Sequence, residues 1–134
     1  MGNETMYSDK KYLSRGEFIE QLGYSIEEAI ELGIAETEDR LFFEKNIERR
    51  TAVRIIHEYM KRCLNLPDLD DISEAEKLKD LYDCHICVNH IAQVFCRGIM
   101  NEYKPGEFGL KCYISKEEAK NIAKRINDIR GLTC

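Results

Sequence analysis

Cysteine and histidine side chains gather in the second half of the chain, at Cys84, Cys87 and His90. Thiolates and an imidazole at this spacing can share one side of a helix, and they suit a tetrahedral Zn²⁺ ion. However, no second Cys-x-x-Cys pair completes the ligand set, and Cys87 falls on an apolar stripe with Ile91, where a free cysteine behaves as a small hydrophobe. We therefore favour packing over metal binding and predict no cofactor.

Other catalytic chemistries find less support. A thioredoxin-like redox role for Cys84 and Cys87 requires a βαβ context, and the sequence offers none. A Cys–His nucleophile would also need an orienting third group, which a sequence alone does not place. The pair His57-Glu58 lacks the second histidine of a zincin motif, and we interpret it as an exposed pair on a long helix. We predict that the protein is not an enzyme.

Composition narrows the function further. The chain has 134 residues, 43% of them hydrophobic and 34% charged, which corresponds to about one soluble domain. Its net charge of −5 disfavours nucleic-acid binding. Basic side chains gather at Arg49, Arg50, Arg54, Lys61 and Arg62, but glutamates interrupt them, and a solvated helix face is the simpler interpretation.

The compartment remains open at this point. No run of about 18 apolar residues predicts membrane insertion, and the polar segment 1–11 lacks the apolar stretch of a signal peptide. The sequence as it stands therefore suggests a cytoplasmic protein, whereas a fragment of a secreted parent would lie at the cell surface. The six cysteines are irregularly spaced, which argues against a disulfide-stabilised miniprotein, and we expect them to be reduced if the protein stays inside the cell.

Helical signals dominate the chain. Ser-x-x-Glu capping boxes begin four segments, and a glycine or Pro67 follows several of them. The predicted helices span residues 14–22, 25–32, 47–65, 73–82, 85–97 and 115–130. Residues 41–43 and 112–114 can each add a short extended stretch. The predicted fold is an all-α helical bundle.

Self-comparison reveals an internal repeat. A helix, a Gly-Ile turn, a loop with an apolar anchor and a second helix occur twice, with the turns at Gly33-Ile34 and Gly98-Ile99. Leu41 and Phe108 are the matching loop anchors, each six residues before the isoleucine that precedes the second helix, Ile47 or Ile114. The matching helix positions are Ala52, Ile55 and Tyr59 in the first copy and Ala119, Ile122 and Ile126 in the second. A partial third copy begins the chain at residues 13–18.

These pieces resemble the S-layer homology domain family. The family repeat has a "GI" turn, a "DGTF" loop and an "ITRAE" helix start, which resemble Gly98-Ile99, residues 103–108 and residues 114–119 here. Asp70-Asp71-Ile72 resembles the start of a family repeat. The resemblance covers residues 13–128, with the motifs in family order. It implies a domain over residues 13–130, after an extension over 1–12, with a partial repeat from 13 and units over 25–66 and 68–130.

The resemblance also implies a fold and a ligand. Such repeats stack about a pseudo-threefold axis and anchor bacterial proteins to anionic cell-wall polysaccharides. The family's arginine matches Arg15 and Arg49, with Lys116 in the third copy. Its glutamate matches Glu17 and Glu118, and Asp71 would brace the loop that begins the last unit. An arginine in the first turn of a helix can grip a carboxylate, or it can simply brace a neighbouring loop, and both interpretations stand.

The chain departs from the family pattern in three places. The middle motif reads Ile47-Glu48-Arg49-Arg50-Thr51, so that Thr51 replaces the family's glutamate. The family's "HWA" segment falls at residues 85–87, where Ile86 replaces the tryptophan, and the chain contains no tryptophan. Only 34 residues separate Leu13 from Ile47, against 67 between Ile47 and Ile114. The first hypothesis is therefore a module that binds an acidic cell-wall glycan. The alternative is an intracellular helical scaffold that has lost the glycan and binds a protein partner or a second copy of itself.

Overall fold

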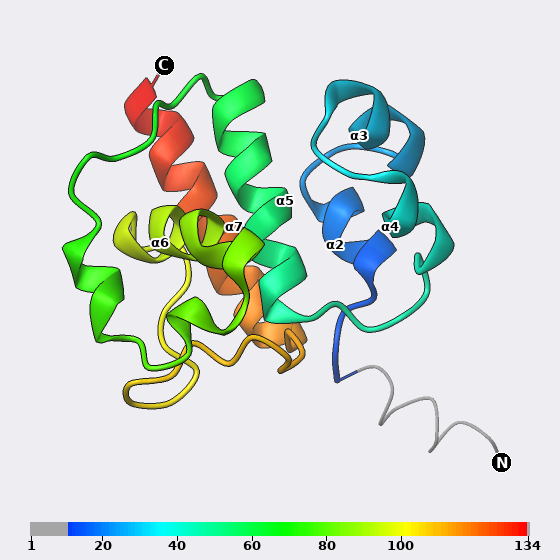
Figure 1. Cartoon of the computed structure of the whole chain (residues 1–134). Helices are drawn as coiled ribbons and strands as arrows, with labels where there is room; N and C mark the ends of the chain where they lie inside the picture. Colours follow the sequence, from blue (N-terminus) through cyan, green and yellow to red (C-terminus); the bar gives the residue numbers. More distant parts are fainter. Residues whose placement is uncertain (1–10, 134) are drawn as a thin grey trace, which may run out of the picture.

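The computed structural model describes residues 11–133, and this part of the chain is all-α, as predicted (Figure 1). Its helices are α2 (Arg15–Gln21), α3 (Ile26–Leu32), α4 (Thr37–Leu41), α5 (Arg49–Arg62), α6 (Val88–Cys96) and α7 (Lys116–Thr133). Residues 11–133 form isolated β-bridges and no named strand. Most of the predicted extension over 1–12, and the signal-peptide question with it, lies outside the described residues.

Two segments differ from the predicted helices. Residues 73–82 form the 3₁₀ turns η1 (Ser73–Lys77) and η2 (Leu81–Asp83) instead of an α-helix. Between these turns the Lys79 N–H donates to the Gly106 carbonyl, and the Asp80 carboxylate accepts from the Phe108 and Gly109 N–H groups. Residues 73–82 therefore hydrogen-bond to a distant loop. The groups used in these bonds are not available to form a continuous α-helix.

The helix α4 was not predicted, and it corrects one part of the repeat. We expected an extended stretch at 41–43 with Leu41 as a buried loop anchor. Leu41 instead ends α4 with 76% of its surface exposed, whereas Phe108 is fully buried. No serine cap marks the start of α4; the Glu36 N–H donates to the Asp39 carboxylate at 2.7 Å. A cap supplied from the third residue of the helix is a weaker sequence signal than Ser-x-x-Glu.

The predicted caps form to different degrees. Ser14 and Glu17 make a complete capping box at α2, and Ser25 and Glu28 make one at α3. At α7 the Ser115 hydroxyl accepts from the Glu118 N–H, but the Glu118 side chain turns to Arg49 instead.

Three short segments that precede helices are joined in a closed ring of backbone hydrogen bonds. The Leu13 N–H donates to the Ile114 carbonyl at 3.0 Å, Ile114 to Ile47 at 3.2 Å, and Ile47 back to Leu13 at 3.0 Å. A second set joins the same three segments in the reverse cyclic order with N···O distances of 2.8 to 3.0 Å: Arg15 to Lys45, Arg49 to Cys112 and Lys116 to Lys11. Buried backbone groups need partners, and here three segments at matching repeat positions satisfy one another.

The helices that follow the ring bury the positions matched in the repeat. Ala52, Ile55, Tyr59, Ala119, Ile122 and Ile126 are each at most 2% exposed. Gly33 and Gly98 both adopt positive φ at helix ends, and the isoleucine after each is buried and donates its N–H five residues back. The repeat seen in the sequence is therefore a repeat of backbone and core positions.

Figure 1 shows how the elements are grouped. The short helices α2, α3 and α4 contact one another on one side of α5, and α6 packs against α5 on the other. The longest helix, α7, is tied to α5 through Arg130, whose guanidinium donates to the Tyr59 hydroxyl. Among residues 11–133, no helix has both the length and the hydropathy required to cross a bilayer.

Candidate functional site

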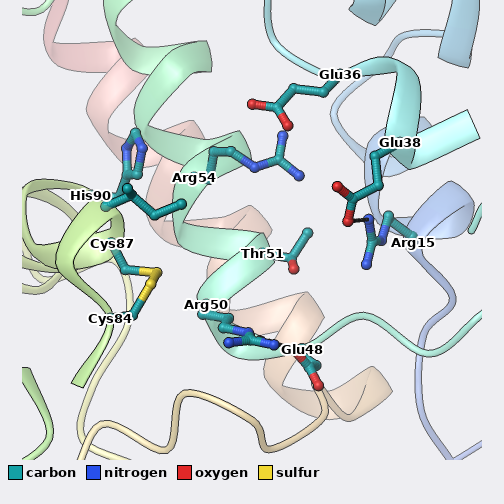
Figure 2. A pocket seen from close by; sticks show the side chains of 11 residues that line it. Arg15, Glu36, Glu38, Glu48, Arg50, Thr51, Arg54, Cys84, Cys87 and His90 are labelled. Atoms are coloured by element: carbon teal, nitrogen blue, oxygen red, sulfur yellow. Dashed lines mark hydrogen bonds and ion pairs between the residues drawn. A yellow bond between two sulfur atoms is a disulfide. The ribbon is translucent and has the colours of Figure 1, made fainter.

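A pocket of about 370 Å³ lies where the α2–α4 group, the start of α5 and the start of α6 meet (Figure 2). Its lining comes from four stretches of chain: Arg15; Glu36 and Glu38; Glu48, Arg50, Thr51 and Arg54; and Cys84, Ile86, Cys87 and His90. Of the residues that the family resemblance singled out, this pocket contains Arg15 alone.

Asp39 organises the arginines beneath this pocket. Its carboxylate is fully buried and accepts from Arg15 Nη1 at 2.9 Å and from Arg54 Nη1 and Nη2 at 3.0 and 2.7 Å. The fork-shaped contact with Arg54 fixes both the distance and the plane of the guanidinium. One carboxylate therefore orients two arginines from different helices.

The charge state of this cluster follows from its contacts. Burial raises the pKa of Asp39, but hydrogen bonds from Arg54, the Glu36 N–H and Arg15 outweigh burial and hold that pKa below its usual value. Burial likewise lowers the pKa of Arg54, and the pairing with Asp39 outweighs it and raises that pKa overall. Asp39 and Arg54 are thus charged at neutral pH.

Two of the arginines keep donors free for another molecule. The side chain of Arg50 is 39% exposed and uses Nε on Glu48 at 2.7 Å. Within residues 11–133, its two Nη nitrogens have no hydrogen-bonded partner. Arg15 Nε is the one buried side-chain nitrogen or oxygen in that range without a hydrogen bond. The pocket thus combines exposed and buried guanidinium donors with the carboxylates of Glu36, Glu38 and Glu48.

Arg49 occupies the matching place in the next unit, and it is buried there. Its side chain is 2% exposed and pairs with Glu118. Nε donates to the Phe108 carbonyl at 2.8 Å, Nη2 donates to the Asn101 carbonyl, and the guanidinium lies over the Phe108 ring at 4.6 Å. Arg49 therefore braces the loop over 101–108, which was the alternative to ligand binding.

The other predicted site residues lie apart from the pocket. Glu17 completes the α2 cap, and Lys116 begins α7. Asp71 is exposed and binds the Ser73 N–H and hydroxyl, and these two hydrogen bonds lower its pKa. The six residues suggested by the resemblance are thus spread over three helix starts and one loop.

Cys84 and Cys87 form a disulfide, which differs from the expectation of six reduced cysteines. Cys63, Cys96 and Cys112 are free and partly buried, and Cys134 lies outside the described residues. No group of three or more potential ligands among residues 11–133 is arranged to hold a metal ion. The joined sulfurs of Cys84 and Cys87 do not offer the thiolates that the zinc interpretation required.

His57 is buried, not exposed as the sequence suggested. It is 2% exposed, and its two ring nitrogens lie 2.7 Å from the Asp68 carboxylate and 2.8 Å from Nδ1 of His90. Burial and the neighbouring His57 lower the pKa of His90 to about 4, so His90 is neutral at pH 7. The three side chains join a loop, α5 and the pocket wall on α6.

Sequence reasoning missed most of the pocket. Arg50 and Arg54 were interpreted as a solvated face, and Asp39 was not considered. The signal that could have found them is the acidic run Glu36-Thr37-Glu38-Asp39, which follows a Gly-Ile turn and faces an arginine-rich helix.

Comparisons of the chain with protein-family models, curated proteins and solved structures found no match. The pocket and its chemistry are therefore the basis for the function proposed below.

Proposed function

We propose that the protein is a non-catalytic binding module of the S-layer homology type, which binds an acidic bacterial cell-wall glycan in the pocket beside Arg15. The closed ring of backbone hydrogen bonds through Leu13, Ile47 and Ile114 carries this proposal. Three repeat positions that meet in cyclic order are what a pseudo-threefold stack of such units requires. The two matching Gly-Ile turns add support from a different part of the repeat.

The pocket suits a sugar that bears an acidic group. The Glu36 and Glu38 carboxylates can accept from sugar hydroxyls, and the unpartnered Nη nitrogens of Arg50 can grip a carboxylate on two donors. Arg15 and Arg54 are already oriented by Asp39, so they require little ordering when a ligand arrives. Arg50 is therefore the principal ligand contact, and Arg15 and Arg54 form the floor.

Cosedimentation with bacterial sacculi tests this proposal. The full chain should pellet with intact sacculi and stay in solution after the secondary polymer has been stripped from them. Arg50→Gln should weaken binding about tenfold, because a charge-assisted pair of hydrogen bonds is lost. Arg62→Gln is the matched control, since Arg62 lies at the other end of α5 outside the pocket and pairs with Glu58.

Two results would count against the proposal. Failure of the unmodified chain to pellet with intact sacculi would remove the glycan as ligand. Equal pelleting by Arg50→Gln and the unmodified chain would show that the protein binds a glycan at a site other than this pocket.

Exposed apolar side chains favour a second candidate, a protein-binding or self-associating scaffold. Leu41 and Ile86 are 76% and 85% exposed, and covering these two side chains in an interface would remove apolar surface from water. Size-exclusion chromatography with light scattering should then show a concentration-dependent dimer. A strict monomer at high concentration would argue against self-association.

A further inference from the structure

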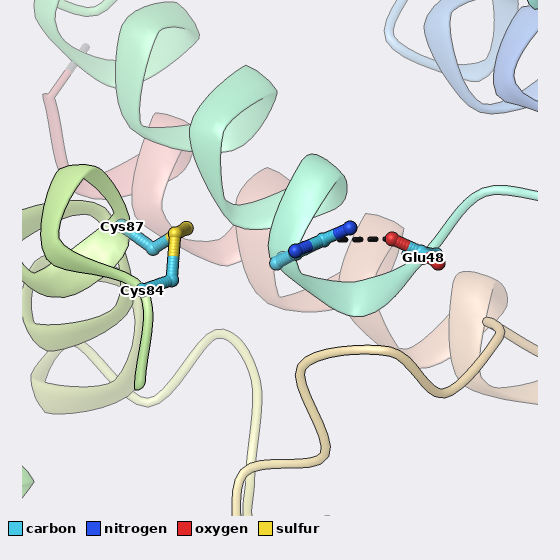
Figure 3. Close-up of a disulfide and its surroundings, with 4 residues drawn as sticks. Glu48, Cys84 and Cys87 are labelled. Atoms are coloured by element: carbon cyan, nitrogen blue, oxygen red, sulfur yellow. Dashed lines mark hydrogen bonds and ion pairs between the residues drawn. A yellow bond between two sulfur atoms is a disulfide. The ribbon is translucent and has the colours of Figure 1, made fainter. Parts of the chain in front are cut away.

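The Cys84–Cys87 disulfide lies in an accessible turn at the start of α6. Two intervening residues, His85 and Ile86, separate the cysteines, and the Cys87 N–H donates to the Cys84 carbonyl at 3.0 Å. Figure 3 shows this turn facing the first turn of α5, next to Glu48. Both cysteines line the pocket, so another molecule that enters it can reach the disulfide.

The two cysteine residues differ in burial. Cys87 is 7% exposed and belongs to the hydrophobic core, whereas Cys84 is only partly buried and packs at the edge of that core. A partner thiol therefore reaches Cys84 more readily than Cys87. An accessible first cysteine with a buried second one lets the first form a mixed disulfide and the second resolve it.

The surroundings favour a thiolate at this turn. Cys87 is the N-cap residue of α6, and the dipole of a helix start stabilises negative charge. Arg50 and Arg54 bring positive charge to the same pocket, where Arg50 is paired with Glu48 (Figure 2). Ile86, 85% exposed between the two cysteines, gives a partner an apolar contact directly beside the sulfurs.

We propose that Cys84 and Cys87 form a redox-active disulfide that exchanges with thiol-bearing partners, with Cys84 as the sulfur that is attacked. This activity does not require the glycan proposal to hold, although both cysteines line the same pocket. A partner thiolate attacks Cys84 Sγ, the bond between the two cysteines breaks, and Cys87 leaves as a thiolate that takes up the proton lost by the attacking thiol.

A second partner thiolate then attacks the partner sulfur of the mixed disulfide and releases Cys84, which takes up the second proton. Two thiols become one disulfide, and the protein disulfide becomes two thiols, so two electrons pass to the protein. The reverse reaction with a partner disulfide restores the bond, so the oxidant is itself a disulfide.

Equilibration of the full chain in mixtures of reduced and oxidised glutathione tests reversibility. Differential alkylation and mass spectrometry of the peptide that contains Cys84 and Cys87 would report the oxidised fraction. We expect this fraction to change with the glutathione ratio in both directions. A bond that persists in excess reduced glutathione, or one that never forms in oxidised glutathione, would overturn the proposal.

Single-cysteine variants test the order of attack. In Cys87→Ala, Cys84 should form a mixed disulfide with oxidised glutathione at least about tenfold faster than Cys87 does in Cys84→Ala, because Cys84 is the more exposed of the two. Cys96 is an internal control in both proteins, since burial raises the pKa of its thiol and slows it. Equal rates for Cys84 and Cys87, or a Cys84 that reacts no faster than Cys96, would overturn the assignment. If a variant misfolds, the glutathione titration of the unmodified chain still tests whether the disulfide is redox-active.

Discussion

Arg15 and Arg49 occupy matching places, each as the first residue of a helix that follows the hydrogen-bonded ring, yet their surroundings differ. Arg49 is enclosed by the loop over 101–108 and uses its donors on two carbonyls and Glu118. Arg15 shares one carboxylate with Arg54 and lines an open pocket.

The loops explain this difference. Between Gly98 and Ile114 the chain crosses the Arg49 guanidinium, with Phe108 buried against it. Between Gly33 and Ile47 the chain is two residues shorter and forms α4, which supplies Asp39 and leaves Leu41 exposed. The same repeat position thus becomes a structural brace in one unit and part of a binding pocket in the other.

The largest expected effect comes from replacing the enclosed arginine. Arg49→Met should lower the free energy of unfolding by about 3–5 kcal/mol, because Glu118 and two carbonyls lose a buried partner. Arg15→Met should cost about 1–2 kcal/mol, since Asp39 keeps Arg54 and the Glu36 N–H. Urea denaturation measures both. If the two variants lose similar amounts of unfolding free energy, Arg15 and Arg49 have the same structural role, and the comparison fails.

Asp39→Asn should cost about 3 kcal/mol at neutral pH, because the buried Arg15 and the partly buried Arg54 lose their shared carboxylate. The folded state holds the pKa of Asp39 below its unfolded value, so this stabilisation is present above about pH 4 and is lost as the pH falls through the lower, folded pKa. Denaturation of both proteins at neutral and strongly acid pH should therefore show that their difference in unfolding free energy disappears in acid. A difference that persists in acid would show that Asp39 does not stabilise the fold as a charged carboxylate.

Gly16 allows the first unit to pack closely, because a Cβ at this position would lie 2.4 Å from the Phe43 ring. Gly16→Ala should therefore cost about 1–3 kcal/mol through overpacking. Gly131→Ala is the control, since nothing lies within 4 Å of its added Cβ and alanine favours the helix by about 0.5–1 kcal/mol. Thermal unfolding should shift downward for the first variant and slightly upward for the second; parallel shifts would argue against the close contact.

The smallest effect concerns His90. Its pKa falls from 6.5 to about 4 in the folded protein, so the unfolded chain binds the extra proton between these values. Stability should be full above pH 6.5 and decline as the pH falls toward 4, by about 1 kcal/mol after allowance for solvent screening. Urea denaturation across this range would show a flatter profile for His90→Gln. An identical profile for both proteins would assign the decline to other groups.

Local signals in the sequence were enough for five of the six described α-helices and for most of the repeat. The serine caps of α2 and α3 and the glycines at 33 and 98 act within one turn, so their residue types report directly on the backbone. The all-α class and the matching buried positions followed from them.

Contacts between distant segments account for what the sequence did not show. His57 is buried because Asp68 and His90 fold over it, and residues 73–82 lose their helix to the loop near Gly106. The arginines of α5 form a pocket only because α4 brings Asp39 to them. None of these partners is within a helical turn of the residue it changes.

A nuclear magnetic resonance titration of the arginine side-chain N–H signals with the purified acidic polymer tests the central claim most directly. Signals of Arg50 and Arg54 should move and saturate as polymer is added, while those of Arg49 stay in place. Movement at Arg49 with a silent Arg50, or no movement at any of the three, would contradict the assignment of the pocket beside Arg15 as the glycan site.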